Sequence, residues 1–397
     1  MAFIKYALPV LAAAHAVFAA DCGDGDTIRI SSQSDLDSYS TCEDLDGDVE
    51  IASSVGGTLT LNGVQRIKGA LTSSGAENIT TFSAPSLETI DDEFHLEGLT
   101  QLTYLEFAEL KSVGSLNFEA LPVLQTLGFT NGVTKAGSVS IVNTGLTTLD
   151  GISLNSVGSF IITDNTQLET VDVNNLKNAT NLINFAGNYH ELEISLPNLA
   201  HGTNLTIRNV SSVSIPSLTK LEGQLGFWGN TFSSLSAPNL TETGDLVFED
   251  NERLSNLSLP VLETVNGGFL ITRNDELTTI SFPKLATVTG AIDFSGDFDS
   301  ASLPSLKNVR GGFNMQSTGN FSCTTFDNWK DNTIHGTYHC KASTPNPTTS
   351  DGSSGSSSNT TSADSSDSTE DAAVLTAANV PVMGVAAIFG MLVQYVL

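Results

Sequence analysis

Four residues near the end of the chain have the types that bind zinc. His335, His339 and Cys340 lie close together, and Cys323 precedes them in the same segment. Zinc is held by histidine nitrogen and cysteine sulfur, but this spacing matches no recognised zinc finger. In an oxidising, secretory setting two such cysteines favour a disulfide over a metal. We therefore expect no metal here, and no cofactor anywhere in the chain.

An acidic segment resembles the beginning of a calcium-binding loop. Asp44-Leu45-Asp46-Gly47-Asp48 supplies carboxylates at alternating positions. A calcium loop also needs glycine at its sixth position and glutamate at its twelfth, where this chain has Val49 and Val55. The pattern is better explained as a hydrated acidic turn.

Paired carboxylates would indicate glycosidic bond cleavage. Glycosidases hold two carboxyl groups about 5 to 10 Å apart, and adjacent coils of a β-solenoid are about 4.8 Å apart. At the middle outward position of the repeat described below, no two neighbouring coils both carry an acid. Asp91-Asp92-Glu93 is interpreted as a charged loop, and His95, His190 and His201 accompany no serine or cysteine motif. Nothing in the sequence argues for an enzyme, although an enzyme is not excluded.

The composition excludes one class of partner. The 397 residues include 44 acidic and 16 basic side chains, for a net charge of −28. Such a chain repels phosphate backbones, so no nucleic acid partner is expected. Hydrophobic residues make up 40%, too many for a disordered protein, and charged residues only 15%. Something other than charge must keep this surface hydrated.

A glycine followed by alternating apolar residues returns along most of the chain. Examples are Gly114-Ser115-Leu116-Asn117-Phe118 and Gly244-Asp245-Leu246-Val247-Phe248. The first apolar residues of successive copies run from Val49 to Phe313, with a mean period of about 22 residues that is typical of a solenoid. A Leu-x-x-Leu segment, a Pro-x-Leu phrase and a third short strand follow within each copy. These short period-2 patterns predict an all-β, β-helix-like leucine-rich solenoid of about 13 coils.

Asparagines recur shortly after successive glycine phrases, at nearly the same interval as the phrases themselves. They are Asn143, Asn165, Asn188, Asn209, Asn230, Asn251 and Asn274. We expect their amides to stack along the solenoid and to satisfy backbone groups of the turns, rather than to form a binding stripe. Asn209 also begins a glycosylation sequon, and a buried amide cannot carry sugar. We therefore expect this sequon to be the least occupied.

Four cysteines bracket the repeats in two local pairs, Cys22 with Cys42 and Cys323 with Cys340. The open ends of a solenoid expose core and strand edges, so they need caps. Three pairings are possible, but only the local one avoids bridging opposite ends of a long rod. We expect two disulfide-bonded caps.

Both ends of the chain carry targeting patterns. Residues 1–19 read as a secretory signal cleaved after Ala19, or after Ala20, with an uncleaved anchor as the alternative. The apolar stretch 380–397 has no basic residue after it and is preceded by small residues, which is typical of a glycosylphosphatidylinositol (GPI) anchor signal. We expect 372–397 to be removed and lipid to be attached at Asp371, with Ser365 or Ser366 as alternatives. The other interpretation is an ordinary terminal membrane helix.

The remaining segments are predicted from composition. Residues 20–342 form the repeat domain, and 343–371 form a Ser/Thr-rich stalk, either O-glycosylated or a bare linker. Eight N-glycosylation sequons would keep the charge-poor surface hydrated. They begin at Asn78, Asn178, Asn204, Asn209, Asn239, Asn256, Asn320 and Asn359.

Taken together, these features resemble a known family. The signal, the terminal cysteine pairs, repeats such as Ser195-Leu196-Pro197-Asn198-Leu199 and Leu259-Pro260-Val261-Leu262, the stalk and the lipid-anchor tail are similar to the fungal GPI-anchored cell-wall organisation proteins. These form the sporulation-specific and extracellular-mutant group, with receptor-L-domain-like repeats. The resemblance covers nearly the whole chain. It implies roles in wall integrity, mannosylation-dependent surface assembly and morphogenesis, and no established catalytic site.

We therefore expect a non-enzymatic, GPI-anchored surface glycoprotein that organises the cell wall. Its expected partners are cell-wall glucans or mannoproteins, and the membrane through its lipid. Its expected location is the outer face of the plasma membrane, and the wall. Two alternatives remain: an enzyme that remodels wall polysaccharide, and a receptor-like ligand-binding module.

Overall fold

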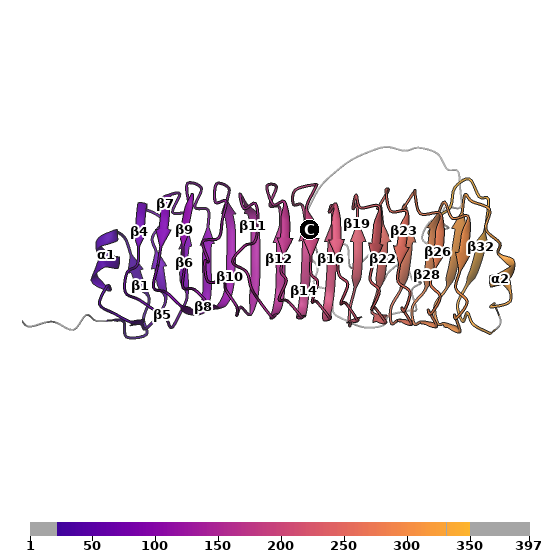
Figure 1. Ribbon diagram of the computed structural model, residues 1–397, viewed down its shortest axis with the longest axis horizontal. Coiled ribbons are helices and arrows are strands. Elements are labelled where there is room, and N and C mark those ends of the chain that lie inside the picture. Colours follow the sequence, from indigo (N-terminus) through magenta and orange to yellow (C-terminus); the bar gives the residue numbers. More distant parts are fainter. Residues whose placement is uncertain (1–21, 331, 350–397) are drawn as a thin grey trace, which may run out of the picture.

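The coils stack into a straight rod with one cap at each end (Figure 1). The computed structural model describes residues 22–330 and 332–349. It is a parallel β-solenoid of about 14 turns, which confirms the predicted all-β solenoid. The turn count exceeds the predicted 13 because cap strands β1 (Ile28–Ile30) and β32 (Tyr338–Lys341) extend the stack.

The longest face of the rod is a 22-stranded parallel sheet. Its principal strands carry the glycine phrases, and each pairs in register with the copy one coil away. Besides β1 and β32 they are β3 (Val49–Ile51), β6 (Leu71–Ser74), β8 (Thr89–Glu97), β10 (Ser112–Leu121), β11 (Ser138–Thr144), β12 (Ser156–Thr163), β14 (Asn178–Ala186), β16 (His201–Arg208), β19 (Leu225–Trp228), β22 (Leu246–Glu249), β25 (Phe269–Thr272), β28 (Ile292–Gly296) and β31 (Phe313–Ser317).

Short return strands lead into this sheet from the preceding side of each coil. They are β2 (Asp44–Leu45), β5 (Arg66–Ile67), β18 (Lys220–Leu221), β21 (Glu242–Thr243), β24 (Thr264–Val265), β27 (Thr287–Val288) and β30 (Asn308–Val309). In coils such as that of β10, the return segment and the principal strand are continuous.

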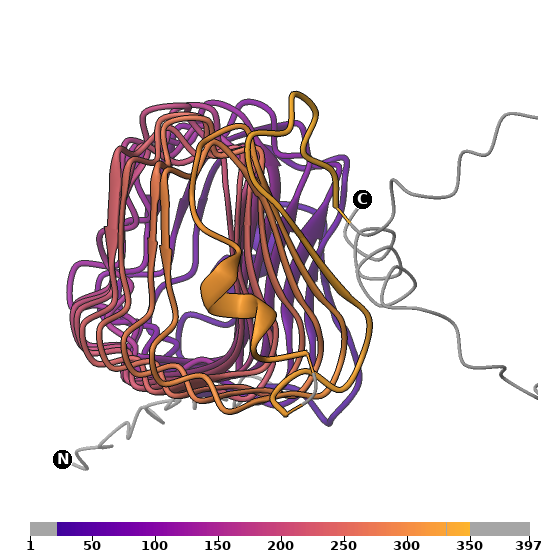
Figure 2. The ribbon, with the colours of Figure 1, turned by 90° about the vertical axis from the view of Figure 1, so that its right-hand side faces the viewer.

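A third face consists of smaller parallel sheets. Their strands are β4 (Gly56–Thr60), β7 (Asn78–Ser83), β9 (Tyr104–Glu106), β13 (Thr170–Asp172), β15 (Glu193–Ser195), β17 (Ser212–Ser214), β20 (Ser234–Ser236), β23 (Asn256–Ser258), β26 (Thr279–Ser281) and β29 (Ser300–Ser302). Figure 2 looks along the rod and shows successive coils superposed around one interior. Alternating apolar residues from all three faces point into that interior and form a single core from Ile28 to Ile334.

The glycine that opens each phrase lies where neighbouring coils approach closely. The amide of Gly137 donates to the carbonyl of Gly114 at 2.8 Å, and Gly158 repeats this contact to Gly137 at 2.7 Å. A Cβ atom on Gly137 would lie 2.7 Å from the Gly114 oxygen. Any larger residue would therefore push the coils apart, which explains the recurrence of glycine.

Five of the seven predicted ladder asparagines are buried in a column along one corner. They are Asn165, Asn188, Asn230, Asn251 and Asn274. The Oδ1 atom of Asn251 accepts bonds from the backbone N and the Nδ2 of Asn230, at 3.1 and 2.8 Å. Its Nδ2 donates to the carbonyl of Phe227 at 3.1 Å and to Asn274 Oδ1 at 3.0 Å. The ladder prediction is confirmed at these positions.

The prediction was wrong for Asn143 and Asn209. Both are exposed and occupy left-handed turn positions, with φ of 53° and 57°, one residue before the buried column. In their coils the buried position is held by Thr144 and Val210. Asparagine is favoured both in left-handed turns and in the ladder, so spacing alone did not separate the two adjacent columns.

Helices lie only at the two ends of the described rod, as α1 (Gln33–Ser38) and α2 (Thr324–Asp327). In the described ranges, no helix has the length and apolar character needed to cross a membrane. The predicted signal peptide, most of the stalk, Asn359, Asp371 and the predicted anchor tail lie outside the described residues. Residues 343–349, assigned to the stalk, are described. Gln316 Nε2 donates to the Thr348 carbonyl at 2.8 Å, so this segment contacts the last coils.

Candidate functional site

The N-terminal cap joins a disulfide to a short helix. Cys22 and Cys42 are bonded across a sequence separation of 20 residues, as predicted. The buried side chain of Leu36 from α1 packs into the end of the core. In the segment that resembled a calcium loop, Asp46 pairs with Lys68 at 3.3 Å. The Oδ1 atom of Asp48 accepts the amide of Ala70 at 2.8 Å. These acids therefore tie the first coils together.

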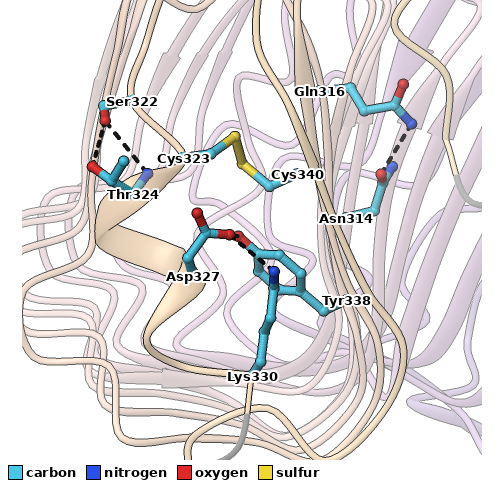
Figure 3. The surroundings of a disulfide bond; sticks show 9 residues. All are labelled: Asn314, Gln316, Ser322, Cys323, Thr324, Asp327, Lys330, Tyr338 and Cys340. Atoms are coloured by element: carbon cyan, nitrogen blue, oxygen red, sulfur yellow. Dashed lines mark hydrogen bonds and ion pairs between the residues drawn. A yellow bond between two sulfur atoms is a disulfide. The ribbon is translucent and has the colours of Figure 1, made fainter.

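The C-terminal cap is drawn in Figure 3. Cys323, at the start of α2, is bonded to Cys340 on β32, which confirms the second predicted pair. Beside it, Asp327 accepts a hydrogen bond from the Tyr338 hydroxyl at 3.1 Å and pairs with Lys330 at 3.1 Å. The bond from Lys330, followed by that from Tyr338, lowers the pKa of Asp327. Both sulfurs of the suspected zinc set are thus in a disulfide.

Seven of the eight predicted sequons fall within the described residues. Six of their asparagines are exposed: Asn78, Asn178, Asn209, Asn239, Asn256 and Asn320. Asn204 differs, because it is half-buried and its Oδ1 accepts the amide of Gln224 at 2.9 Å. A Cβ on Gly223 would lie 2.3 Å from that oxygen, so the amide is pressed against the next coil.

The structure contradicts the premise of the expectation for Asn209. The register of β14, β16 and β19 places Gly187 and Gly229 at the equivalent position on the two neighbouring coils. Neither glycine has a side chain beside the Asn209 amide. The premise that Asn209 points into the ladder is therefore wrong, and Asn204 is the least accessible sequon among those described.

The outward face of the large sheet has an acidic first section. His95 lies between Glu93 and Glu97, with N–O distances of 3.8 and 3.5 Å. Glu97 is also in register with Glu119 on the next coil. The repeat pattern did not indicate this acidic pair, because it lies two residues beyond the middle outward position of the glycine phrase. Asp91, from the cluster interpreted as a charged loop, binds Arg66 through both carboxylate oxygens.

Farther along the same face, a cation, an aromatic ring and an acid follow one another on three coils. The Arg208 guanidinium lies 4.2 Å from the centre of the Trp228 ring. The Trp228 Nε1 donates to Glu249 at 3.0 Å. A Cβ on Gly226 would meet the tryptophan ring at 1.9 Å, so the ring covers that glycine. Sequence reasoning missed this row, because its members belong to three separate copies of the repeat.

The loops that connect the asparagine column to the third face form a ridge along the rod, and a notch interrupts this ridge. Ile194 and Val213 pair in register only 19 residues apart, whereas Val171 and Ile194 are 23 apart. Most of the difference lies in this ridge. Four residues, 189–192, connect the column residue Asn188 to β15, whereas Ser211 alone connects the column residue Val210 to β17. The longer neighbouring loops flank this short one and leave a hollow of about 1090 Å³.

The walls of this notch carry aromatic and charged groups. The rings of Tyr189 and His190 are 4.6 Å apart at 70° on one wall. The Tyr189 hydroxyl donates to Glu191 Oε2 at 3.3 Å. The charge of Glu191, followed by burial, raises the pKa of Tyr189, so this hydroxyl remains a donor over a wide pH range. Arg253 lies on the opposite side.

Comparison with known proteins adds to this geometry. A family model described as "Ecm33: GPI-anchored cell wall organization protein" matches residues 1–40. The chain is 62% identical to "Protein ecm33" of Aspergillus fumigatus, with 100% of both chains covered. It is 44% identical to "Cell surface GPI-anchored protein" of Arthroderma benhamiae, over 89% of this chain and 91% of the relative. It is 35% identical to "Cell wall protein ecm33" of Schizosaccharomyces pombe, over 81% and 78%. The chain belongs to the Ecm33 family.

Membership of the Ecm33 family agrees with the resemblance inferred from the sequence. The protein is a GPI-anchored protein of the cell surface and cell wall, with a part in wall organisation. The relatives' names include no enzyme. Across the described residues, no three histidine, cysteine or acidic side chains form a metal-binding group.

Proposed function

We propose that this Ecm33-family protein acts without catalysis, as a rigid scaffold that presents its repeat faces to wall glucans or mannoproteins. The supporting observation is the middle of the large sheet, where hydroxyl and amide side chains repeat in register from coil to coil. Ser115, Ser138 and Ser159 form one outward row. Asn117 and Ser140 form a shorter row beside it, which ends at Ile161 on the next coil.

Such a surface suits a long polysaccharide. Coils about 4.8 Å apart repeat their polar groups at a constant interval, and a linear polymer of sugars also repeats its hydroxyl groups at a constant interval. Removing water from neutral side chains costs less free energy than removing it from charged ones. Each contact with a sugar is weak, but the contacts add along the rod instead of concentrating in one site.

The anchor completes this proposal. Lipid on Asp371, or on Ser365 or Ser366, would hold the protein at the membrane while a Ser/Thr-rich segment lets the rod reach into the wall. Deleting 372–397 should release a folded protein into the medium. Recovery of a peptide containing residues 391–397 from the mature protein would show that the tail is retained, and would overturn the anchor site.

The proposed function is tested by incubating the secreted rod, 20–349, with an array of wall oligosaccharides. Among the residues that the structure describes, the core runs from Ile28 to Ile334, and this truncation keeps all of it. The array is read both for bound protein and for released sugar products. Binding without product release is expected. Product release would favour the remodelling enzyme, and Glu97 with Glu119 would then be the first pair to replace.

A further inference from the structure

We infer that the notch over Ser211 is a binding site for a short, neutral oligosaccharide. The inference rests on the proposed function, and it places one contact between the rod and a wall sugar at this notch. The notch lies on the ridge beside the third face, away from the outward rows of the large sheet. It would therefore bind one short stretch or end of a chain, whereas the flat face contacts a long one.

The shape of the notch is set by the backbone. Its depth comes from the short loop at Ser211, and not from side chains that could rotate to fill it. That loop is fixed, because the Ser211 amide donates to the Leu192 carbonyl at 3.0 Å and its hydroxyl donates to the Glu191 carbonyl at 2.8 Å. A preformed hollow binds without the cost of ordering a loop.

The chemistry of the walls matches a sugar. Carboxylates accept hydrogen bonds from hydroxyl groups, and bonds to a charged partner are the stronger kind. Glu191 and Glu193 supply such acceptors on the wall that also carries the rings of Tyr189 and His190. Aromatic rings pack against the apolar C–H faces of a sugar while their polar edges remain hydrated. Ser233 adds a hydroxyl from the loop on the facing side.

The same groups disfavour other ligands. Three glutamates, at positions 169, 191 and 193, line the notch and would repel phosphate or another anion. The facing side carries Arg253 and no lining carboxylate, so a strongly basic peptide would find acidic partners on one wall only. The lining is too polar for a lipid chain, because burying these groups without partners is costly. A neutral ligand rich in hydroxyl groups satisfies both walls.

Three variants test the site by different routes. Tyr189→Ala removes the ring, and Glu191→Gln removes the charge while keeping the shape. Ser233→Trp fills the hollow from an exposed position on the facing loop and leaves Tyr189 and Glu191 in place. The matched control is Tyr104→Ala, since Tyr104 is 52% exposed on β9, outside the notch.

The sequon at Asn209 requires a second control. It ends at Ser211, so a sugar on Asn209 lies beside the notch. Each variant is therefore compared with its parent in both the natural and the Asn209→Gln background. Binding to the rod 20–349 is measured by titration with a β-1,3-glucan hexamer, an α-mannan tetramer, a chitin hexamer and oligolysine, and thermal unfolding confirms that each variant is folded.

We expect the parent to bind at least one neutral oligosaccharide. Tyr189→Ala, Glu191→Gln and Ser233→Trp should each weaken that binding roughly tenfold or more, as loss of one charge-assisted bond or one ring contact does. Tyr104→Ala should bind like the parent. If the parent binds sugar and all three notch variants bind equally well, the notch inference is wrong and the proposed function stands. If the parent binds no neutral sugar, or oligolysine alone, both are wrong.

Discussion

Replacing Asn251 with alanine tests whether the asparagine ladder stabilises the rod. Asn251 is fully buried, and its side chain makes four hydrogen bonds to the coils on either side. The substitution deprives two buried backbone groups, the amide of Asn230 and the carbonyl of Phe227, of their side-chain partner. Each such loss costs about 1–3 kcal/mol. The local free energy of unfolding should therefore fall by roughly 2–6 kcal/mol.

Hydrogen exchange with mass spectrometry is the suitable assay, because coils of a solenoid contact only their neighbours and can open locally. A loss of about 2 kcal/mol or more corresponds to exchange at least roughly thirtyfold faster. We expect this in peptides from β19, β22 and β25. Peptides from β3 and β6, near the N-terminal end of the rod, should exchange as in the parent.

Asn143→Gly is the matched control. Asn143 is an exposed asparagine with a φ of 53°, a conformation that glycine adopts readily. We expect this variant to change the local stability by less than about 0.5 kcal/mol. Equal protection in Asn251→Ala and the parent, or an equal loss in Asn143→Gly, would refute the reasoning that the buried amides hold the coils together.

Three further results are expected. Replacing Cys323 and Cys340 with serine should destabilise the C-terminal cap by about 3 kcal/mol, which is the typical effect of opening a disulfide loop of this size; differential scanning calorimetry should show a lower transition temperature, and an unchanged one would contradict this. The lowered pKa of Asp327 means that its bonds to the cap stabilise the fold above the ordinary aspartate range and lose this effect as pH falls through the lowered pKa; the protection of cap amides, measured relative to their intrinsic exchange at each pH, should therefore fall in acid, and Asp327→Asn should remove that pH dependence. Site-resolved mass spectrometry should find Asn204 the least glycosylated of the described sequons and Asn209 well occupied; the reverse order would contradict the observed burial.

The repeat architecture could be read from the sequence because it is a local property. Each coil buries its apolar residues against the next copy of the same pattern, so a regular period, with a glycine at each close approach, specifies the stacking. The two disulfides also followed from position, since cysteine pairs confined to the two ends of a rod can join only locally. The Ser/Thr-rich and apolar segments beyond residue 349 remain predictions from composition.

The surface features depended on the tertiary structure. Asparagine suits two adjacent positions of the turn, and only the backbone conformation shows that Asn209 is exposed while Asn230 is buried. The pair Glu97 and Glu119, the row from Arg208 to Glu249 and the notch over Ser211 each unite residues from different coils. Coil lengths vary from 19 residues between Ile194 and Val213 to 25 between Phe313 and Tyr338. The period alone therefore cannot say which outward side chains are neighbours, because strand register decides that, and register is set only when the coils stack.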